Sequence, residues 1–259
     1  MNLLFKPFAL LNANVLKLLG LGQVLFLVLV WATASLGTVP SPLEVLNALD
    51  KLASTEGLLF ELATSAFTNM KALALSTVIS LMLVYATIIP FFRPAVSLYS
   101  GLRFLGMAGL TFLATLWLGG GEPLKMAMLV FGMTVFMVTS MYAEVKNIPS
   151  EQFDHAYTLG MSDTQVLYDV VIRGTLSNML DIVRQNAAIG WMMLSMVEGL
   201  VRSGGGIGTM LLNQNKHLHL DAVFAIQLTI LAVGLLQDLA LGHLRNFMCP
   251  YATLTKVKQ

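Results

Sequence analysis

Four stretches of this chain contain no charged residue and are long enough to cross a membrane as helices. They have 26, 21, 18 and 18 residues and cover 18–43, 72–92, 104–121 and 126–143. A helix rises 1.5 Å per residue, so a hydrocarbon layer of about 30 Å takes about 20 apolar residues. Two shorter runs, 185–197 and 222–237, lie among further apolar residues. The pattern predicts an all-helical, polytopic membrane protein with about six transmembrane helices.

The composition excludes the main alternatives to a membrane protein. Only 11% of the residues are charged, whereas soluble domains have about 25%. The hydrophobic share of 56% and the mean hydropathy of +0.76 exceed what one soluble core can bury, and they also exclude disorder. A net charge of +1 gives no basis for binding nucleic acid. We therefore expect the lipid bilayer to surround this chain.

The sequence offers no catalytic or metal site. Its single cysteine, Cys249, cannot form an internal disulfide, and the paired-cysteine spacings of zinc sites are absent. His217 and His219 lack a third metal ligand. No serine lies in a G-x-S-x-G frame, and no G-x-x-x-x-G-K-[ST] phosphate-binding loop is present. We expect no catalytic residue, no metal and no cofactor bound by this chain.

The lysine and arginine residues favour one orientation in the membrane. If the N-terminus is cytoplasmic, nine of them lie in the predicted inside segments, and four lie in the outside segments: Lys51, Lys125, Arg202 and Lys216. Because cytoplasmic loops carry excess positive charge, this distribution predicts that both termini are cytoplasmic. A second interpretation stays open for residues 1–34: Lys17, followed by an apolar run ending in Ala32-Thr33-Ala34, is also typical of a cleaved signal peptide.

A short helix is predicted on the outer side, after the first crossing. Residues 43–53 have leucines at positions 43, 46, 49 and 52, with charged residues between them. This spacing is typical of an amphipathic helix that lies on the membrane surface or on neighbouring crossings.

The longest polar segment, residues 144–174, lies on the predicted cytoplasmic side. Ser150 is a favourable N-cap for a helix over 151–159, and Gly160 supplies a left-handed C-terminal residue. Ser162, with a glutamine three residues later, forms a capping box that begins a second helix. We expect two short helices joined by a sharp bend, serving either as a binding surface or as a solvated connector.

This cytoplasmic segment resembles the coupling loop of bacterial ABC importer permeases. The loop's signature is Glu-Ala-Ala, three further residues and Gly, and it is matched here by Asp154-His155-Ala156-Tyr157-Thr158-Leu159-Gly160. Further matches indicate the nitrate/sulfonate/taurine/bicarbonate group: Val39-Pro40-Ser41-Pro42, Gly121-Glu122-Pro123-Leu124-Lys125, Glu198 and Gly205-Gly206-Ile207-Gly208. The resemblance covers about residues 36–250.

The resemblance implies the fold of a type I importer permease, with 1–259 forming one transmembrane domain and 150–174 the coupling loop. It implies a bacterial inner-membrane protein that passes a small polar or anionic solute to the cytoplasm by alternating access. The implied partners are a second permease subunit, identical or homologous, two cytoplasmic ATPase subunits and an outside solute-binding protein. ATP and Mg would be bound by the ATPase subunits.

Two sets of candidate residues follow. In the coupling loop, the resemblance implies contact with the ATPase through the apolar anchors Phe153, Tyr157 and Leu159, the polar residues Asp154 and His155, and the signature residues Ala156 and Gly160. Residues on the predicted crossings could line the solute pathway: Thr111, Thr115, Asn186, Ser195, Glu198 and Arg202. The alternative for each Ser or Thr is a hydrogen bond to its own helix backbone.

Charged residues in the last crossings have more than one interpretation. Asp181 and Arg184 share a helix face and could pair, but we favour contact with water beside the coupling loop. Glu198 and Arg202 lie four residues apart, and we favour their pairing over the alternative that Arg202 faces an anionic solute. Asp238 is interpreted as an edge charge that reaches toward water. The third crossing lacks the prolines usual in the family at its start, so we expect a straighter helix there.

Two other function classes stay open. A secondary transporter or channel driven by an ion gradient would need no ATPase. Internal inverted repeats and buried paired charges would favour this class, and the sequence shows no convincing repeat. A scaffold that holds a cytoplasmic partner without transport is the third possibility. The sequence does not specify the solute.

Overall fold

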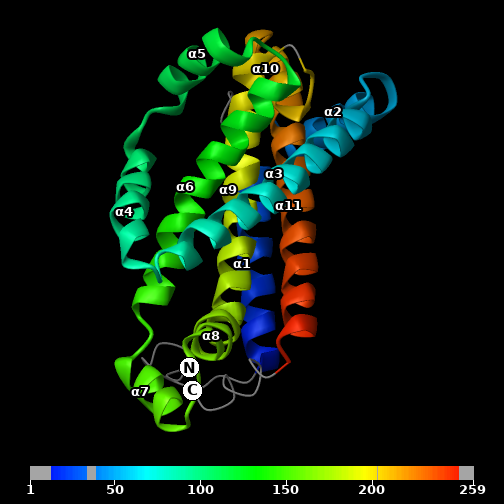
Figure 1. Ribbon diagram of the computed structural model, residues 1–259. Coiled ribbons are helices and arrows are strands. Elements are labelled where there is room, and N and C mark those ends of the chain that lie inside the picture. Colours follow the sequence, from blue (N-terminus) through cyan, green and yellow to red (C-terminus); the bar gives the residue numbers. More distant parts are fainter. Residues whose placement is uncertain (1–12, 34–38, 203, 251–259) are drawn as a thin grey trace.

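The computed structural model describes residues 13–33, 39–202 and 204–250, which form helices and no strand (Figure 1). The long helices are α1 (Ala13–Thr33), α3 (Leu58–Ala86), α6 (Glu122–Lys146), α9 (Gly174–Val201) and α11 (Leu220–Met248). The short helices are α2 (Pro42–Thr55), α4 (Arg93–Gly101), α5 (Met107–Leu118), α7 (Ser150–Thr158), α8 (Asp163–Val166) and α10 (Ile207–Lys216). Two 3₁₀ turns, η1 (Pro90–Phe92) and η2 (Leu102–Phe104), and a π-helical segment, η3 (Leu167–Arg173), complete the described elements. Both termini and the end of the signal-like run at Ala34 lie outside the described residues.

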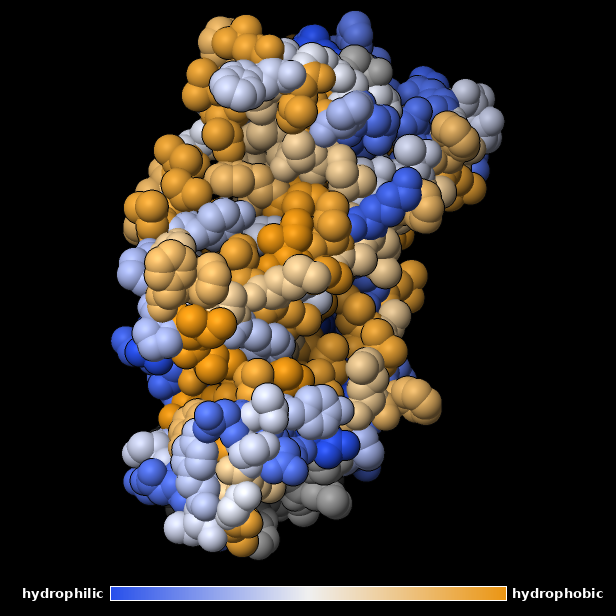
Figure 2. Space-filling model, in the orientation of Figure 1, coloured by the Kyte–Doolittle hydropathy of each residue, from blue (hydrophilic) through white to orange (hydrophobic). Residues whose placement is uncertain are grey.

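Helices α6, α9 and α11 run between two ends of the molecule, and α3 crosses them at an angle (Figure 1). One end carries α5 and α10 and the other carries α7 and α8; we call them the α10 end and the α7 end. Figure 2 shows a largely apolar middle, a hydrophilic α7 end and further hydrophilic residues over α2. Large apolar side chains lie on the outside, and Trp117 on α5 is 90% exposed. Such a surface is suited to lipid rather than to water.

The described helices account for most of the predicted crossings. By length and hydropathy, α1, α3, α6 and α11 could each span a membrane, and a fifth span arises if the bent pair around α4 and α5 counts as one. Helix α9, at the place of the predicted fifth crossing, has 28 residues and is about 42 Å long. It is therefore long enough to cross, although it carries three charged residues.

The expectation of a straight third crossing is wrong. The chain forms α4, the turn η2 and then α5, and the axes of Pro90–Phe104 and Gly109–Leu118 differ by 112°. The break needs no proline, because Leu105 and Gly106 both take extended backbone conformations that end one helix before the next begins. With only 12 residues, α5 is too short to cross a bilayer alone.

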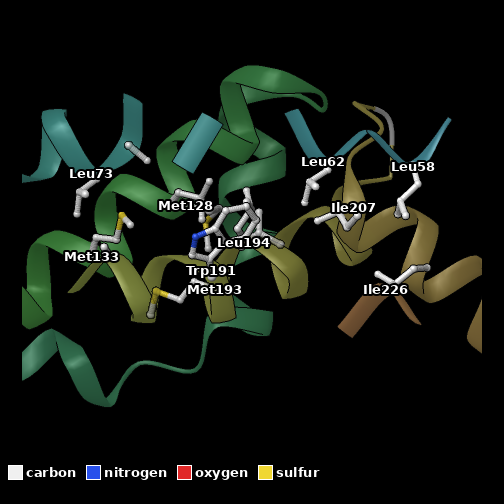
Figure 3. Packing of buried hydrophobic residues seen from close by; sticks show 14 of the residues in the cluster. Leu58, Leu62, Leu73, Met128, Met133, Trp191, Met193, Leu194, Ile207 and Ile226 are labelled. Atoms are coloured by element: carbon white, nitrogen blue, oxygen red, sulfur yellow. The ribbon is translucent and has the colours of Figure 1, made fainter. Parts of the chain in front are cut away.

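The hydrophobic core lies where α3, α6 and α9 meet (Figure 3). Met128 and Met133 on α6 and Leu194 on α9 are at most 2% exposed, and Ile207 at the start of α10 is fully buried. Methionine side chains are flexible and fill the irregular gaps between crossing helices. This packing fixes α9 and the start of α10, which carry the polar groups described below.

The amphipathic helix predicted over 43–53 is confirmed as α2, but its buried face differs from the expected one. Ser41 caps it, with its hydroxyl accepting from the Glu44 amide and the Glu44 carboxylate accepting from the Ser41 amide. Val45, Ala48 and Leu52 face the protein. Leu43 and Leu46, which belong to the predicted leucine stripe, are exposed.

Candidate functional site

The polar segment between α6 and α9 folds into two short helices with a sharp bend, as predicted. Helix α7 ends before Gly160, whose φ of +77° is the left-handed conformation expected of it. Ser162 and Gln165 form the expected capping box at the start of α8. The predicted N-cap is displaced by one residue, because Pro149 takes the extended cap position and Ser150 is the first helical residue. We call residues 150–166 the elbow.

The outer face of the elbow carries unburied apolar side chains. Tyr157 is 50% exposed and Leu159 is 66% exposed, whereas Phe153 is half-buried and Ala156 is buried. Asp154 and His155 are exposed on the same helix. The elbow therefore presents Tyr157 and Leu159 as free apolar groups beside polar ones.

An internal hydrogen bond holds the two arms of the elbow together. The Tyr157 hydroxyl donates to Asp163 Oδ1 across 3.0 Å. This hydrogen bond and the charge of the carboxylate raise the pKa of Tyr157 above its ordinary range. The shift has the direction expected of a hydroxyl that donates to a carboxylate, because loss of its proton would place two negative groups side by side.

The second helix of the elbow, α8, is joined to α9 without a break in the helical backbone. Residues 163–201 are helical throughout, passing from α8 through η3 into α9. The path turns at η3 (Figure 1), and π-helical segments of this kind are frequent at functional sites. The second arm of the elbow and α9 therefore share one continuous helical backbone.

Helix α9 is held against α11 by two ion pairs that sequence spacing did not reveal. Arg184 donates to both carboxylate oxygens of Asp238. Arg245 lies 2.9 Å from the Asp181 carboxylate and donates to Ser177 across 2.9 Å. Asp181 and Arg184 therefore do not take up the alternative of pairing with each other, and the interpretation of Asp238 as an edge charge is wrong, because it is an interhelical partner. Arg184 and Asp181 each lie within ion-pair distance of a residue on α11, although they are only three positions apart on α9.

A buried charge network lies at the α10 end of α9. Glu198 and Lys125 are both fully buried, and Glu198 Oε1 lies 3.6 Å from Lys125 Nζ. The Glu198 carboxylate also accepts from the Ser65 hydroxyl at 2.8 and 2.9 Å and from the Gly208 amide at 2.9 Å. The expected pairing of Glu198 with Arg202 is wrong, because Lys125 on α6 takes that place.

Lys125 ties the glycine-rich segment before α10 to this network. Its ammonium group donates to Glu122 at 2.9 Å and to the carbonyls of Gly204 and Gly205, each at 3.3 Å. The amide of Gly206 donates to Glu61 on α3. We call Glu61, Ser65, Lys125 and Glu198 the buried network. The sequence placed Lys125 among the charges of the outer loops. It is the last residue of the stretch 121–125, which resembles the family.

The sequence profile of the family described as "Binding-protein-dependent transport system inner membrane component" matches residues 23–248. The chain belongs to this family. This inner membrane component is a multi-pass ABC importer permease, and the elbow and the buried network both lie inside the matched region.

Two curated relatives are similar to this permease. It is 27% identical over 249 residues to the taurine transport system permease protein TauC of Escherichia coli (strain K12), a match that covers 90% of this chain and 89% of the relative. It is 26% identical over 137 residues to the putative aliphatic sulfonates transport permease protein SsuC of Bacillus subtilis (strain 168). That match covers 53% of this chain and 49% of the relative.

Solved structures share the fold of the permease. An inward-facing structure of the MetNI methionine ABC transporter matches with a TM-score of 0.60 at 13% identity, covering 73% of this chain and 95% of that chain. An amino acid ABC transporter crystallised with histidines matches with a TM-score of 0.60 at 14% identity, covering 77% and 96%. The predicted fold class is thereby confirmed.

The permease's predicted pathway residues lie in different surroundings. Hydroxyls of Thr111, Thr115 and Ser195 donate to carbonyls of their own helices, and so does the Asn186 amide. Glu198 belongs to the buried network. Ser195 and Arg202 both line one groove between α9, α10 and α11. Of the six predicted pathway residues, Ser195 and Arg202 are the two that line the same groove. A role in the solute pathway stays a prediction for all six.

Close contact between α9 and α10 requires a glycine at position 208. A Cβ at Gly208 would lie 2.3 Å from the Ser195 carbonyl oxygen, which is backbone and cannot move aside cheaply. We expect Gly208→Ala to destabilise the permease by about 1–3 kcal/mol through overpacking. The measurement is the free energy of unfolding in detergent micelles.

Gly199 provides the matched control on the facing helix. A Cβ there has its nearest neighbour at 3.7 Å, an ordinary van der Waals contact. Gly199→Ala should therefore stay within about 0.5 kcal/mol of the original chain. Equal stability of the two variants would show that α9 and α10 are not held this closely.

Proposed function

We propose that this permease moves a small polar or anionic solute across the inner membrane by alternating access, driven by a separate ATPase that docks on the elbow. The observation that carries the proposal is the exposed pair Tyr157 and Leu159, on a bent segment whose second helix, α8, continues into α9 without a break. Apolar anchors of this kind supply most of the energy of a protein interface.

The proposed orientation in the membrane decides which end of the permease meets which partner. The lysine and arginine distribution supports a cytoplasmic α7 end and cytoplasmic termini. In that orientation the elbow faces cytoplasmic ATP, and the α10 end faces an outside solute-binding protein. Residues 150–174 then act as the coupling loop of a single permease domain that covers 1–259.

The proposed assembly contains two permease subunits and two ATPase subunits. The second permease subunit is identical or homologous to this one, and the ATPase subunits bind ATP and Mg. The names of the relatives, which refer to taurine and aliphatic sulfonates, support a sulfonate as the first solute to test. No cofactor is assigned to this chain.

Purification through this chain tests the assembly. We expect a stoichiometric ATPase subunit to co-purify, and we expect ATP hydrolysis in proteoliposomes to be stimulated by the solute-loaded binding protein. Uptake driven by an ion gradient in the absence of ATP would instead assign the chain to secondary transport. A stable complex that transports nothing would assign it a scaffold role.

A further inference from the structure

A groove between α9, α10 and α11 lies beside the buried network but is separate from it. Its volume is about 890 Å³, within the range of small-molecule sites. Apolar walls come from residues such as Met196, Leu211 and Val223. Arg202 is the only charged residue among the described residues that line it. The groove therefore has the composition of a site for a small organic ion, with apolar walls and one fixed charge.

Three polar side chains of the groove have no partner in the described part of the chain. These are the guanidinium of Arg202 on the C-terminal side of α9, the amide of Asn215 on α10 and the amide of Gln227 on α11, all of which are exposed. Arg202 offers a rigid fork of N–H donors, and each amide offers an NH₂ group. Donors from three different helices thus border the same groove.

The charged residues nearest to Arg202 at this end do not line the groove. Lys125 and Glu198 face each other and are fully buried. Asp221 lines a different hollow, together with Lys51 and His219. Arg202 is consequently the charge that the groove presents to a solute.

The backbone of Arg202 adds a second observation. Its φ is +45°, an uncommon value for a residue with a side chain. Residues held in such conformations gather at ligand-binding and switch sites. The amide of Arg202 still donates to the Glu198 backbone carbonyl at 3.1 Å, so this residue closes the last turn of α9.

We propose that Arg202 is a specificity-determining residue of this permease, which binds the oxyanion group of the solute in the groove while Asn215 and Gln227 donate to the same ligand. This inference rests on the proposed function for its solute. A guanidinium binds carboxylate, sulfonate or phosphate oxygens through two parallel hydrogen bonds. A lysine at this position would supply the positive charge but not the two parallel N–H donors of a guanidinium.

The test places a single thiol in the groove. Ser195→Cys lines the groove, and Cys249→Ser removes the natural thiol. The full-length permease is held in phosphatidylcholine nanodiscs. Its thiol is modified by methanethiosulfonate reagents of similar size, one carrying a sulfonate and the other a quaternary ammonium group. The readout is the ratio of the anionic to the cationic reaction rate.

We expect the anionic reagent to react faster and Arg202→Gln to lower the rate ratio about tenfold, as loss of a charged hydrogen-bond partner does. Arg202→Lys should retain part of the ratio. Lys216→Gln removes an equal charge from the end of α10, outside the groove, and should leave the ratio unchanged. A ratio that Arg202→Gln leaves unchanged, or an equal fall with Lys216→Gln, would overturn the proposal.

A protection experiment, in which an added compound slows modification of the thiol, distinguishes three roles of Arg202: binding a solute, binding a lipid headgroup and stabilising the end of α9. Ethanesulfonate should slow modification in the original protein but not in Arg202→Gln, and ethanol should slow it in neither. If protection disappears when phosphatidylglycerol is added, the groove binds lipid and the proposal fails. If the Arg202 guanidinium only offsets the dipole at the end of α9, Arg202→Gln should lower the stability of the permease, and ethanesulfonate should not slow thiol modification even in the original protein.

The two proposals can fail separately. The thiol assay needs neither ATP nor an ATPase, so it reports on the groove even if ATP-driven uptake is absent. If ATP-driven ethanesulfonate uptake occurs with the same KM in Arg202→Gln, the proposed function stands and the assignment of Arg202 is wrong.

Discussion

Replacing Lys125 by methionine is expected to destabilise the permease by about 3–5 kcal/mol, the usual cost of leaving a buried charge without its partner. The change removes the ammonium group from Glu122, Glu198 and the two glycine carbonyls. Glu198 would then be a fully buried carboxylate with hydrogen bonds but no countercharge. The measurement is unfolding by SDS in detergent micelles, followed by circular dichroism.

A double variant shows whether Lys125→Met destabilises the permease through the lost ion pair with Glu198 or through lost packing of the lysine side chain. Lys125→Met together with Glu198→Gln removes both charges, and glutamine can still accept from Ser65 and Gly208. We expect the double variant to be more stable than Lys125→Met alone, with a coupling of about 0.5–3 kcal/mol. Lys51→Met on the exposed side of α2 should change stability by less than about 0.5 kcal/mol. Additive single effects would show that the two charges do not act as a pair.

Truncating Leu159 on the elbow is expected to weaken ATPase binding about 30-fold, which corresponds to about 2 kcal/mol. The side chain is 66% exposed, so its removal takes little packing from the permease itself. The stability of Leu159→Ala should therefore match that of the original chain. The measurement is the affinity of the purified ATPase for the permease in nanodiscs.

Leu43→Ala is the matched control for this prediction. Leu43 is also an exposed leucine, but it lies on α2, away from the α7 end. Its truncation should leave ATPase affinity unchanged. Tyr157→Phe adds a second comparison, because it keeps the ring and removes the hydrogen bond to Asp163. Equal affinities of Leu159→Ala and Leu43→Ala proteins for the ATPase would place the docking surface elsewhere.

Local structure was the part of the fold that the sequence predicted best. The turn at Gly160 and the capping box of Ser162 depend on residues within a few positions of each other. Their conformations follow from backbone sterics and short-range hydrogen bonds, which sequence spacing displays directly. Helix α2 was also predicted, from its leucine spacing, although its cap at Ser41, three residues from Glu44, was not.

Partners across helices were the part that the sequence could not supply. Arg184 has Asp181 three residues away but bonds Asp238, which is 54 positions later in the chain. Lys125 looked like a loop charge because only the fold shows that Gly204, Gly205 and Glu198 surround it. Choosing among such partners requires knowing which helices adjoin, and hydropathy carries no such information.

The bend before α5 shows a different limit of sequence reasoning. Absence of proline suggested a straight helix, but Leu105 and Gly106 interrupt it with extended backbone. Proline is one cause of a helix break and glycine is another, so the absence of the first does not exclude a break. The positions of the apolar segments were easier to predict, because they depend on hydropathy along the chain and not on the straightness of each helix.

Site-specific cross-linking from the elbow tests the central claim most directly, namely that a separate ATPase docks there. With Cys249→Ser as background, Leu159→Cys and Leu43→Cys each provide one exposed thiol, at the α7 end and on α2 respectively. In native membranes treated with a short bifunctional thiol reagent, we predict a cross-link to the ATPase from position 159 and none from position 43. A cross-link from position 43 alone, or an ATPase-containing complex in which position 159 stays unlinked, would contradict the account.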